Sequence, residues 1–367
     1  MRLATRRHWE NYLAALRLAA ILGGSFGIAA GAVMIKPPLA GALFGFVSGV
    51  VDFTAGMALI GAAGIFLPRT RLGRSLASLP FLAGVFATGA LYLTVVLAVI
   101  GGRLGPQVAG LIGGPGVATQ ISAQIDAAFP RGLLVVVAAL VTLLLVMLRQ
   151  AAQLVGERTF RMVIRGRYRR PRAEERFFLF IDIIGSTPVA EKLGALSVHK
   201  YLNRIFQETS DPVDDHGGEV YQYVGDEIVV TWLVPEGRVG AKPLACFFAI
   251  EAALARLAPE FEREFGTVPG LRAALHAGEV VTGEAGGSRR AIVFHGDVMN
   301  ATSRIENLTR ALGHPFLVSE DARARMQGTE AYAFTDLGLQ ELRGKQAPVR
   351  VYSVAPARVQ RLATVAV

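Results

Sequence analysis

The apolar and polar positions divide the chain into two parts with different periodicities. Four long and nearly uninterrupted apolar stretches fall within residues 1–150, namely Leu18–Ile35, Leu39–Leu67, Leu79–Gly101 and Gly132–Leu148. A helix needs roughly 20 apolar residues to cross the core of a bilayer. The pattern therefore predicts that residues 1–150 form an all-α bundle of four transmembrane helices.

The next segment, residues 151–172, keeps a helical pattern that stops at Arg170–Pro171. Seven arginines lie between Arg158 and Arg172. A basic helix that leaves a membrane on its cytoplasmic side is attracted to anionic lipid headgroups. We expect a helical linker that either anchors the topology or transmits a signal to the following domain.

Residues 173–356 change to short β-rich runs, with Leu271–Ala277 and Val280–Thr282 as separate strands on either side of Gly278. These runs alternate with three helical patterns, Ser197–His216, Pro243–Phe265 and Asp297–Leu312. The order of a strand, a long helix, a hairpin, a second long helix and another strand is that of the ferredoxin-like βαββαβ unit. We therefore predict an α+β domain here and a C-terminal tail at residues 357–367. In this topology the strand that ends near Asp182 lies beside the hairpin that turns at Asp226.

Composition and charge agree with this division. The chain has 367 residues, of which 52% are hydrophobic, and its mean hydropathy is +0.42. Residues 1–172 carry 18 basic and 4 acidic side chains, whereas residues 173–367 carry 20 and 25. The basic excess thus lies beside apolar stretches, where the positive-inside rule explains it and nucleic acid is not needed as a partner. The rule predicts a multi-pass protein of the inner (plasma) membrane, in contact with lipids and with both termini in the cytoplasm.

Two single residues qualify this picture. Cys246 is the only cysteine, so the chain has no intrachain disulfide. Asp52 falls near the middle of the second apolar stretch. An ionisable group inside a membrane is a candidate functional residue. Asp52 is therefore either a sensor for an unknown ligand of the membrane domain or a protonated residue that is hydrogen-bonded within the bundle.

Asp182 and Asp226 each stand at the end of a predicted strand. Hard carboxylate oxygens are the ligands that Mg²⁺ takes together with the phosphates of a substrate. The two aspartates therefore predict a divalent-metal phosphate site.

Four motifs in order resemble the class III adenylate and guanylate cyclases, in particular the bacterial, membrane-anchored ones. They are FIDIIGST with Asp182, YVGDE with Asp226, FHGDVMNATSRIE with Asn300 and Arg304, and ELRGKQAPVRVYSV with Lys345. The resemblance covers residues 168–354. It implies a class III cyclase catalytic domain that works as a homodimer with shared sites.

The resemblance also implies roles for individual residues. Asp182 and Asp226, with the carbonyl of Ile183, would hold two Mg²⁺ ions per site, and Mn²⁺ can substitute for them. The first ion lowers the pKa of the ribose 3′-hydroxyl and the second binds the triphosphate. Asn300 would orient the ribose, and Arg304 would neutralise charge on the α-phosphate.

The remaining implied roles concern the terminal phosphates and the purine base of the nucleotide substrate. Lys345, helped by Arg343, would hold the terminal phosphates. Gln222 and Val293 stand where adenylate cyclases usually have a lysine and an aspartate that read adenine. The function expected is conversion of ATP to 3′,5′-cyclic AMP and pyrophosphate. The alternatives are a guanylate cyclase that uses GTP and a catalytically silent nucleotide-binding membrane receptor or scaffold.

Overall fold

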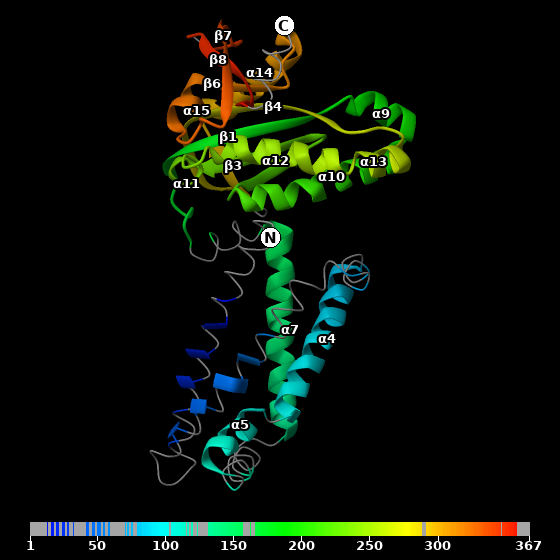
Figure 1. Ribbon diagram of the computed structural model, residues 1–367, viewed down its shortest axis with the longest axis vertical. Helices are drawn as coiled ribbons and strands as arrows, with labels where there is room; N and C mark the ends of the chain where they lie inside the picture. Colours follow the sequence, from blue (N-terminus) through cyan, green and yellow to red (C-terminus); the bar gives the residue numbers. More distant parts are fainter. Residues whose placement is uncertain are drawn as a thin grey trace. The chain divides into compact units, whose positions relative to one another are not determined.

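The computed structural model describes residues 79–102, 104–114, 131–156, 166–287, 291–345 and 347–357, together with single positions between residues 13 and 162. The chain forms two compact units, Met1–Glu157 and Arg158–Val367 (Figure 1). The predicted domain limits at residues 150, 172 and 356 stay predictions.

In the first unit the structure describes three helices, which are α4 (Phe81–Gly102), α5 (Leu104–Gly113) and α7 (Arg131–Val155). Helices α4 and α7 pack together around Val85, Tyr92 and Val146, with Leu143 beside them. They coincide with the third and fourth apolar stretches of the sequence. The first two stretches fall mostly outside the described residues.

No helix within the described residues is both long enough and apolar enough to cross a membrane. The predicted transmembrane four-helix bundle is therefore not confirmed. Asp52 occupies a helical and partly buried position. Its predicted role as a sensor is not tested by this placement.

The second unit is an α+β domain around one sheet of eight strands. The strands are β1 (Arg172–Ile184), β2 (Glu219–Val224), β3 (Glu227–Leu233), β4 (Gly270–Ala285), β5 (Ala291–His295), β6 (Phe316–Ser319), β7 (Tyr332–Gln340) and β8 (Val349–Pro356). The helices are α9 (Ser186–Leu193), α10 (Ala195–Asp215), α11 (Val234–Gly237), α12 (Lys242–Arg256), α13 (Ala258–Phe265), α14 (Asp297–Leu312) and α15 (Glu320–Arg325).

The strand order is β2-β3-β1-β4-β6-β8-β7, and β5 pairs with β4 outside this path. The first four strands and their helices follow the predicted βαββαβ order, with β1 antiparallel to both β3 and β4. The sequence pattern missed β7 and divided β4 into two strands at Gly278. In the structure β4 is continuous over 16 residues.

Two hydrophobic layers enclose the sheet. Helices α10 and α12 cover one face, where Phe177 and Leu179 of β1 meet Tyr201 and Phe247. Helix α14 covers the other face, where Phe178 and Phe180 of β1 are buried beside residues of α14 (Figure 1). Successive residues of a strand point to opposite faces. Even-numbered residues of β1 therefore face the layer that contains α14.

The segment before β1 differs from the predicted helix. Residues 166–170 form turns instead of continuing a helix to Arg170. The Tyr168 side chain is only 1% exposed. The end of the predicted linker is thus built into the α+β domain.

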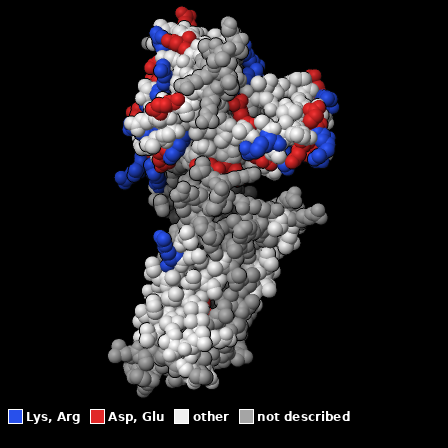
Figure 2. Space-filling model, in the orientation of Figure 1, with Lys and Arg blue, Asp and Glu red and all other residues white. Residues whose placement is uncertain are grey.

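Charged side chains cover the surface of the second unit. On the face shown in Figure 2, basic and acidic groups are interspersed over this unit, while the described surface of the first unit is mostly uncharged. The difference matches the composition of the two halves of the sequence.

Candidate active site

Asp182 lies on the even-numbered face of β1, near the end of the strand, and is 8% exposed. It stands opposite Arg272 of β4 in the antiparallel register. Arg272 Nη2 donates to Asp182 Oδ2 at 2.6 Å, and Arg310 Nη2 of α14 lies 3.4 Å from the same oxygen. The carboxylate is thus held by two cations from elements far away in the sequence.

Ile183 points its side chain to the opposite face, where it is 1% exposed. Strand β1 pairs with β3 only as far as Ile181. The register therefore leaves residues 182–184 without a partner in β3, and the ligand role of the Ile183 carbonyl stays a prediction.

Asp226 lies in the two-residue turn between β2 and β3. Val224 pairs with Glu227 across that turn, and Gly225 has φ 63°. A left-handed conformation favours glycine in such hairpin turns. Because β3 lies beside β1, the turn brings the partly buried Asp226 to the Asp182 end of β1.

Two further carboxylates, Glu227 and Glu306, join the aspartates. Burial and the charges of Glu306, Asp182 and Asp226 raise the pKa of Glu227 to about 7. Burial and the charge of Asp182 also raise the pKa of Glu306, although Arg272 and Arg310 oppose the shift. One buried oxygen, Glu306 Oε1, has no hydrogen-bond partner among the described residues. The carboxylates are therefore close enough to destabilise one another's charge.

Negative charge exceeds positive charge in this cluster. When all are ionised, Asp182, Asp226, Glu227 and Glu306 bring four negative charges against two positive charges from Arg272 and Arg310, and the raised pKa values of Glu227 and Glu306 reduce this excess near pH 7. We call these six residues the acidic cluster.

Sequence reasoning missed the two glutamates and the two arginines of the acidic cluster. Glu306 did appear in the sequence as a neighbour of Arg304, where it could equally be a surface salt-bridge partner. In the structure it lies 4.0 Å from Arg272 instead.

The donor set fits a divalent cation. Uncompensated carboxylate oxygens are the hard ligands that Mg²⁺ and Mn²⁺ take, and Mg²⁺ also keeps waters or substrate phosphates. In the part of the chain that the structure describes, no three His, Cys, Asp or Glu side chains are arranged to hold a metal by themselves.

A second cluster, of mostly positive charge, surrounds the start of α14. Arg304 Nη1 lies 4.0 Å from Asp297 Oδ1, and Lys345 Nζ lies 3.7 Å from Asp297 Oδ2. Gly344 has φ 78°, and a Cβ there would come within 3.4 Å of Arg304 Nη2. The loop before β8 therefore places Lys345 beside Arg304.

The other predicted residues of this cluster are exposed. Asn300 and Arg343 are both on the surface. Asn300 precedes Arg304 by one turn of α14, so the two share a helical face. A hollow of about 600 Å³ beside Lys345 is lined by Asp297, Glu320, Asp321 and Arg350 among others, and its lining does not include Asn300, Arg304 or Arg343. We call Asn300, Arg304, Arg343 and Lys345 the phosphate cluster.

Helix α14 separates the two clusters within one chain. Glu306 and Arg310 turn toward Asp182, whereas Arg304 turns toward Asp297 and the Lys345 loop. At about 100° per residue, Glu306 is rotated by roughly 200° from Arg304. A single chain therefore does not bring the two aspartates, Asp182 and Asp226, and the Asn300–Arg304 pair into one site.

The two predicted base-reading residues lie on strands β2 and β5, and the residues next to them in the sequence are in contact with each other. Gln222 on β2 is exposed and Val293 on β5 is partly buried. The adjoining rings of Tyr221 and Phe294 have centroids 4.8 Å apart. This contact holds β2 and β5 together over the face of the sheet.

Comparisons with known proteins agree with these features. A family model described as "Adenylate and Guanylate cyclase catalytic domain" matches residues 170–355. "Adenylate cyclase 2" of Rhizobium meliloti (strain 1021) is 38% identical over 202 residues, which cover 55% of this chain and 56% of that protein. "Adenylate cyclase" of Anabaena cylindrica is 27% identical over 182 residues, or 48% of this chain and 36% of that protein.

A solved structure described as "Structure of a bacterial light-regulated adenylyl cyclase" has a TM-score of 0.50 and 20% identity. The match covers 62% of this chain and 68% of that one. It shows a common fold. The sequence matches above span about half or less of the length of the curated relatives.

Proposed function

We propose a function from one premise: the chain belongs to the family of adenylate and guanylate cyclase catalytic domains. The proposed reaction is the conversion of ATP to 3′,5′-cyclic AMP and pyrophosphate. The observation that carries this proposal is the unbalanced acidic cluster, in which four carboxylates face two arginines. Together with the phosphate cluster it supplies both signs of charge that a metal–triphosphate substrate requires.

The metal-binding residues in this proposal are Asp182, Asp226 and the carbonyl of Ile183. Two Mg²⁺ ions, or Mn²⁺ in their place, would supply activation of the 3′-hydroxyl and binding of the triphosphate. Arg272 and Arg310 hold the Asp182 carboxylate in place through the same oxygen, Oδ2. Such fixed orientation is what a metal ligand needs from its surroundings.

The phosphate cluster would act on the reacting groups. Asn300 orients the ribose so that the 3′-oxygen lies in line with the α-phosphorus. The bond from this oxygen to phosphorus forms as the bond to the β-phosphate bridge breaks, and the hydroxyl proton passes to solvent. Arg304 stabilises the charge that develops on the α-phosphate, and Lys345 with Arg343 holds the departing pyrophosphate.

The proposed assembly is a homodimer with two shared sites. The acidic and phosphate clusters lie on different sides of α14 in one chain. A two-fold dimer can place the acidic cluster of one chain opposite the phosphate cluster of the other, and the reverse pair then forms by symmetry. Each complete site would contain residues of both chains.

ATP is the proposed substrate because the relative with 38% identity is named an adenylate cyclase. Gln222 and Val293 replace the usual adenine-reading pair, which makes GTP the competing substrate. A glutamine amide has a donor and an acceptor and can meet either purine edge. An assay with ATP and with GTP therefore decides which purine nucleotide is the substrate.

Membrane attachment remains a proposal drawn from the sequence. Residues 1–150 would anchor the chain in the inner membrane with both termini in the cytoplasm, and Asp52 would be the candidate sensor. Residence of the chain in the membrane fraction after alkaline carbonate extraction would support this. Its release into the supernatant would refute it.

The experiment that tests the function is an assay of the purified full chain with ATP and GTP, each with Mg²⁺ and with Mn²⁺. Formation of cyclic AMP from ATP is expected. Preferential formation of cyclic GMP would make the chain a guanylate cyclase. No turnover of either nucleotide at high protein concentration would contradict the proposal and favour a silent nucleotide-binding receptor or scaffold.

A further inference from the structure

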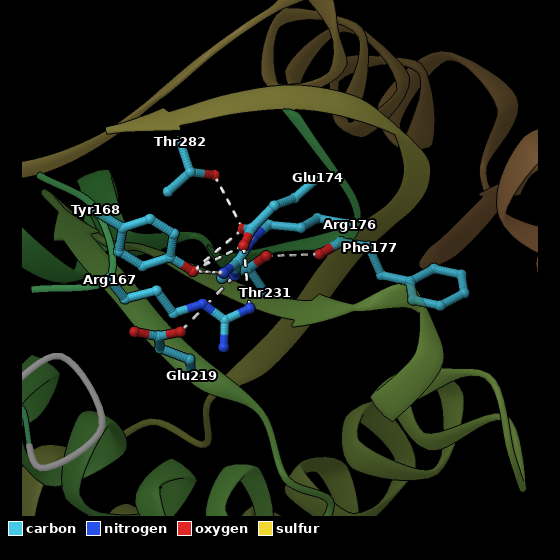
Figure 3. A network of polar contacts seen from close by, with 8 residues as sticks. All are labelled: Arg167, Tyr168, Glu174, Arg176, Phe177, Glu219, Thr231 and Thr282. Carbon is cyan, nitrogen blue, oxygen red and sulfur yellow. Dashed lines mark hydrogen bonds and ion pairs between the residues drawn. The ribbon is translucent and has the colours of Figure 1, made fainter. Parts of the chain in front are cut away.

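A buried polar network lies at the start of β1, at the opposite end from Asp182 (Figure 3). Its centre is Arg176, which is 1% exposed. Arg176 Nη2 donates to the Tyr168 hydroxyl at 2.9 Å, and Arg176 Nε donates to Glu174 Oε2 at 3.1 Å. Its Nη1 atom lies 3.7 Å from Glu219 Oε2. The guanidinium is thus fixed on three sides.

Tyr168 comes from the turns that precede β1 and is fixed as firmly. Its hydroxyl donates to Glu174 Oε2 at 3.1 Å, and its carbonyl accepts from the Glu284 amide of β4 at 3.1 Å. Pro171 lies against Gly283, where a Cβ would come within 3.3 Å of the proline ring. The segment before β1 is therefore attached to β4 and, through the tyrosine hydroxyl, to Arg176.

Arg176 also reaches the two strands that carry the purine-facing positions. Its guanidinium carbon lies 4.7 Å from the ring centroid of Phe294, the residue after Val293 on β5. Glu219, its ion-pair partner, begins β2, the strand that carries Gln222. Arginine is well suited to this position because its planar fork can form ion pairs and stack on a ring at the same time.

No backbone pairing joins β2, which carries Gln222, directly to β5, which carries Val293. Strand β2 is separated from β4, the partner of β5, by β3 and β1. The β2–β3 register also shifts between Val220 and Gln222. What joins β2 to β5 is a set of side chains over the sheet face, namely Arg176, Phe294 and Tyr221.

We propose that Arg176, held by Tyr168, is a positioning residue that sets the purine-facing side chains of Gln222 and Val293. The inference rests on the proposed function, because the purine is what these two positions would meet. Arg176 would not touch the nucleotide. It would act through Phe294 on β5 and through Glu219 on β2.

The test is Tyr168→Phe in the full chain, which removes the hydroxyl but keeps the buried ring. The measurement is kcat and KM for ATP and for GTP. The ratio of kcat/KM for ATP to that for GTP is expected to change by about three- to tenfold, the range that one hydrogen bond contributes. Most of the change should lie in KM, because the acidic and phosphate clusters are not altered.

The matched control is Thr231→Val. Thr231 is also fully buried near the start of β1, and its hydroxyl donates to the Phe177 carbonyl at 2.9 Å (Figure 3). This variant also loses one buried hydroxyl, but that hydroxyl contacts the β1 backbone and not Arg176. Its thermal midpoint should fall about as far as that of Tyr168→Phe, with the ATP:GTP ratio unchanged.

An ATP:GTP ratio that stays constant in Tyr168→Phe while the thermal midpoint falls would reduce the network to a structural role and overturn the inference. Arg176→Lys provides a second variant, which keeps the charge but loses the planar fork, and it should alter the ratio in the same direction. If the wild type turns over neither nucleotide, the proposed function fails. The dissociation constants of non-hydrolysable ATP and GTP analogues, measured by calorimetry on the same variants, then decide the positioning role separately.

Discussion

The two ends of β1 each hold a cluster of charged side chains around a buried residue of the strand, Arg176 at one end and Asp182 at the other, but only one of the clusters is balanced. At the start of the strand, the positive charges of Arg167 and Arg176 meet the negative charges of Glu174 and Glu219. At its end, the acidic cluster has two more negative than positive charges when every carboxylate is ionised. The strand is the same, so the difference lies in the partners.

The balanced charges form a structural network, whereas the excess of carboxylates supports the proposed metal site. Burying an ion pair carries a desolvation cost that the attraction of its fixed partners offsets, and removing one partner leaves an uncompensated buried charge. An excess of carboxylates instead destabilises the cluster through mutual repulsion, which a bound cation would relieve. The charge balance thus distinguishes the two ends better than burial does, since Asp182 and Arg176 are both buried.

The largest effect is expected from removing an aspartate charge from the acidic cluster at the end of β1. Asp182→Asn should lower cyclic-nucleotide formation by at least about 1,000-fold, because several kcal/mol of metal-dependent stabilisation of the transition state is lost. Asp226→Asn should behave alike. The matched control is Glu208→Gln, an acid of α10 that pairs with Arg204 at the surface. Full activity of either aspartate variant would contradict the metal-binding role.

The next largest effect is expected from removing a carboxylate charge from the balanced network at the start of β1. Glu174→Gln should lower the free energy of unfolding of the α+β domain by about 3 kcal/mol at neutral pH, since it leaves Arg176 buried without its carboxylate. Denaturant unfolding followed by tryptophan fluorescence measures this, because Trp232 is in the core of the domain.

The same variant has a predictable pH dependence. Burial acts to raise the pKa of Glu174, but the charge and hydrogen bonds of Arg176, with those of Tyr168 and Thr282, bring it below 4.5. A carboxylate with a lowered folded-state pKa contributes stability above its unfolded pKa and loses it as pH falls through the folded value. The difference between wild type and Glu174→Gln should therefore be full at pH 7 and shrink below pH 4.5. A difference that grows on acidification would be incompatible with this network.

A smaller effect is expected when Mn²⁺ is added, because the metal should stabilise the protein through the acidic cluster and not through the Arg176 network. Mn²⁺ at thirty times its dissociation constant should stabilise the α+β domain by about 2 kcal/mol, which raises the thermal midpoint by roughly 4–8 °C. Asp182→Asn should abolish the shift, while Glu174→Gln should keep it. An equal shift in both variants would mean that Mn²⁺ binds elsewhere.

Local sequence patterns predicted those parts of the fold that depend on neighbours in the chain. The helix Asp297–Leu312 and the hairpin turn at Gly225–Asp226 have the expected limits. Gly278 was misread as a break in β4. In the structure, a Cβ at this position would lie 2.7 Å from Val298 Cγ2, so glycine there permits the close approach of α14.

In the candidate site too, the sequence predicted residues that belong to local patterns but not their long-range partners. Asp182 and Asp226 were identifiable because each stands at the end of a local pattern. Arg272 and Arg310 were not, since they reach Asp182 from positions 90 and 128 residues away. The partner of Arg304 is Asp297, at the start of the same helix, and not the nearer Glu306. The charge balance that distinguishes the two ends of β1 exists only in the folded chain.

The most direct test of the central claim is whether two inactive chains restore one another. Asp182→Ala and Arg304→Ala are co-expressed, and mixed dimers are counted by native mass spectrometry before cyclic-nucleotide formation is measured. We expect each variant to be inactive alone and the mixture to recover about a quarter of wild-type activity, because half of the randomly paired dimers are mixed and each keeps one complete site. Mixed dimers that form in the expected amount but stay inactive would contradict a site shared between the acidic cluster of one chain and the phosphate cluster of the other.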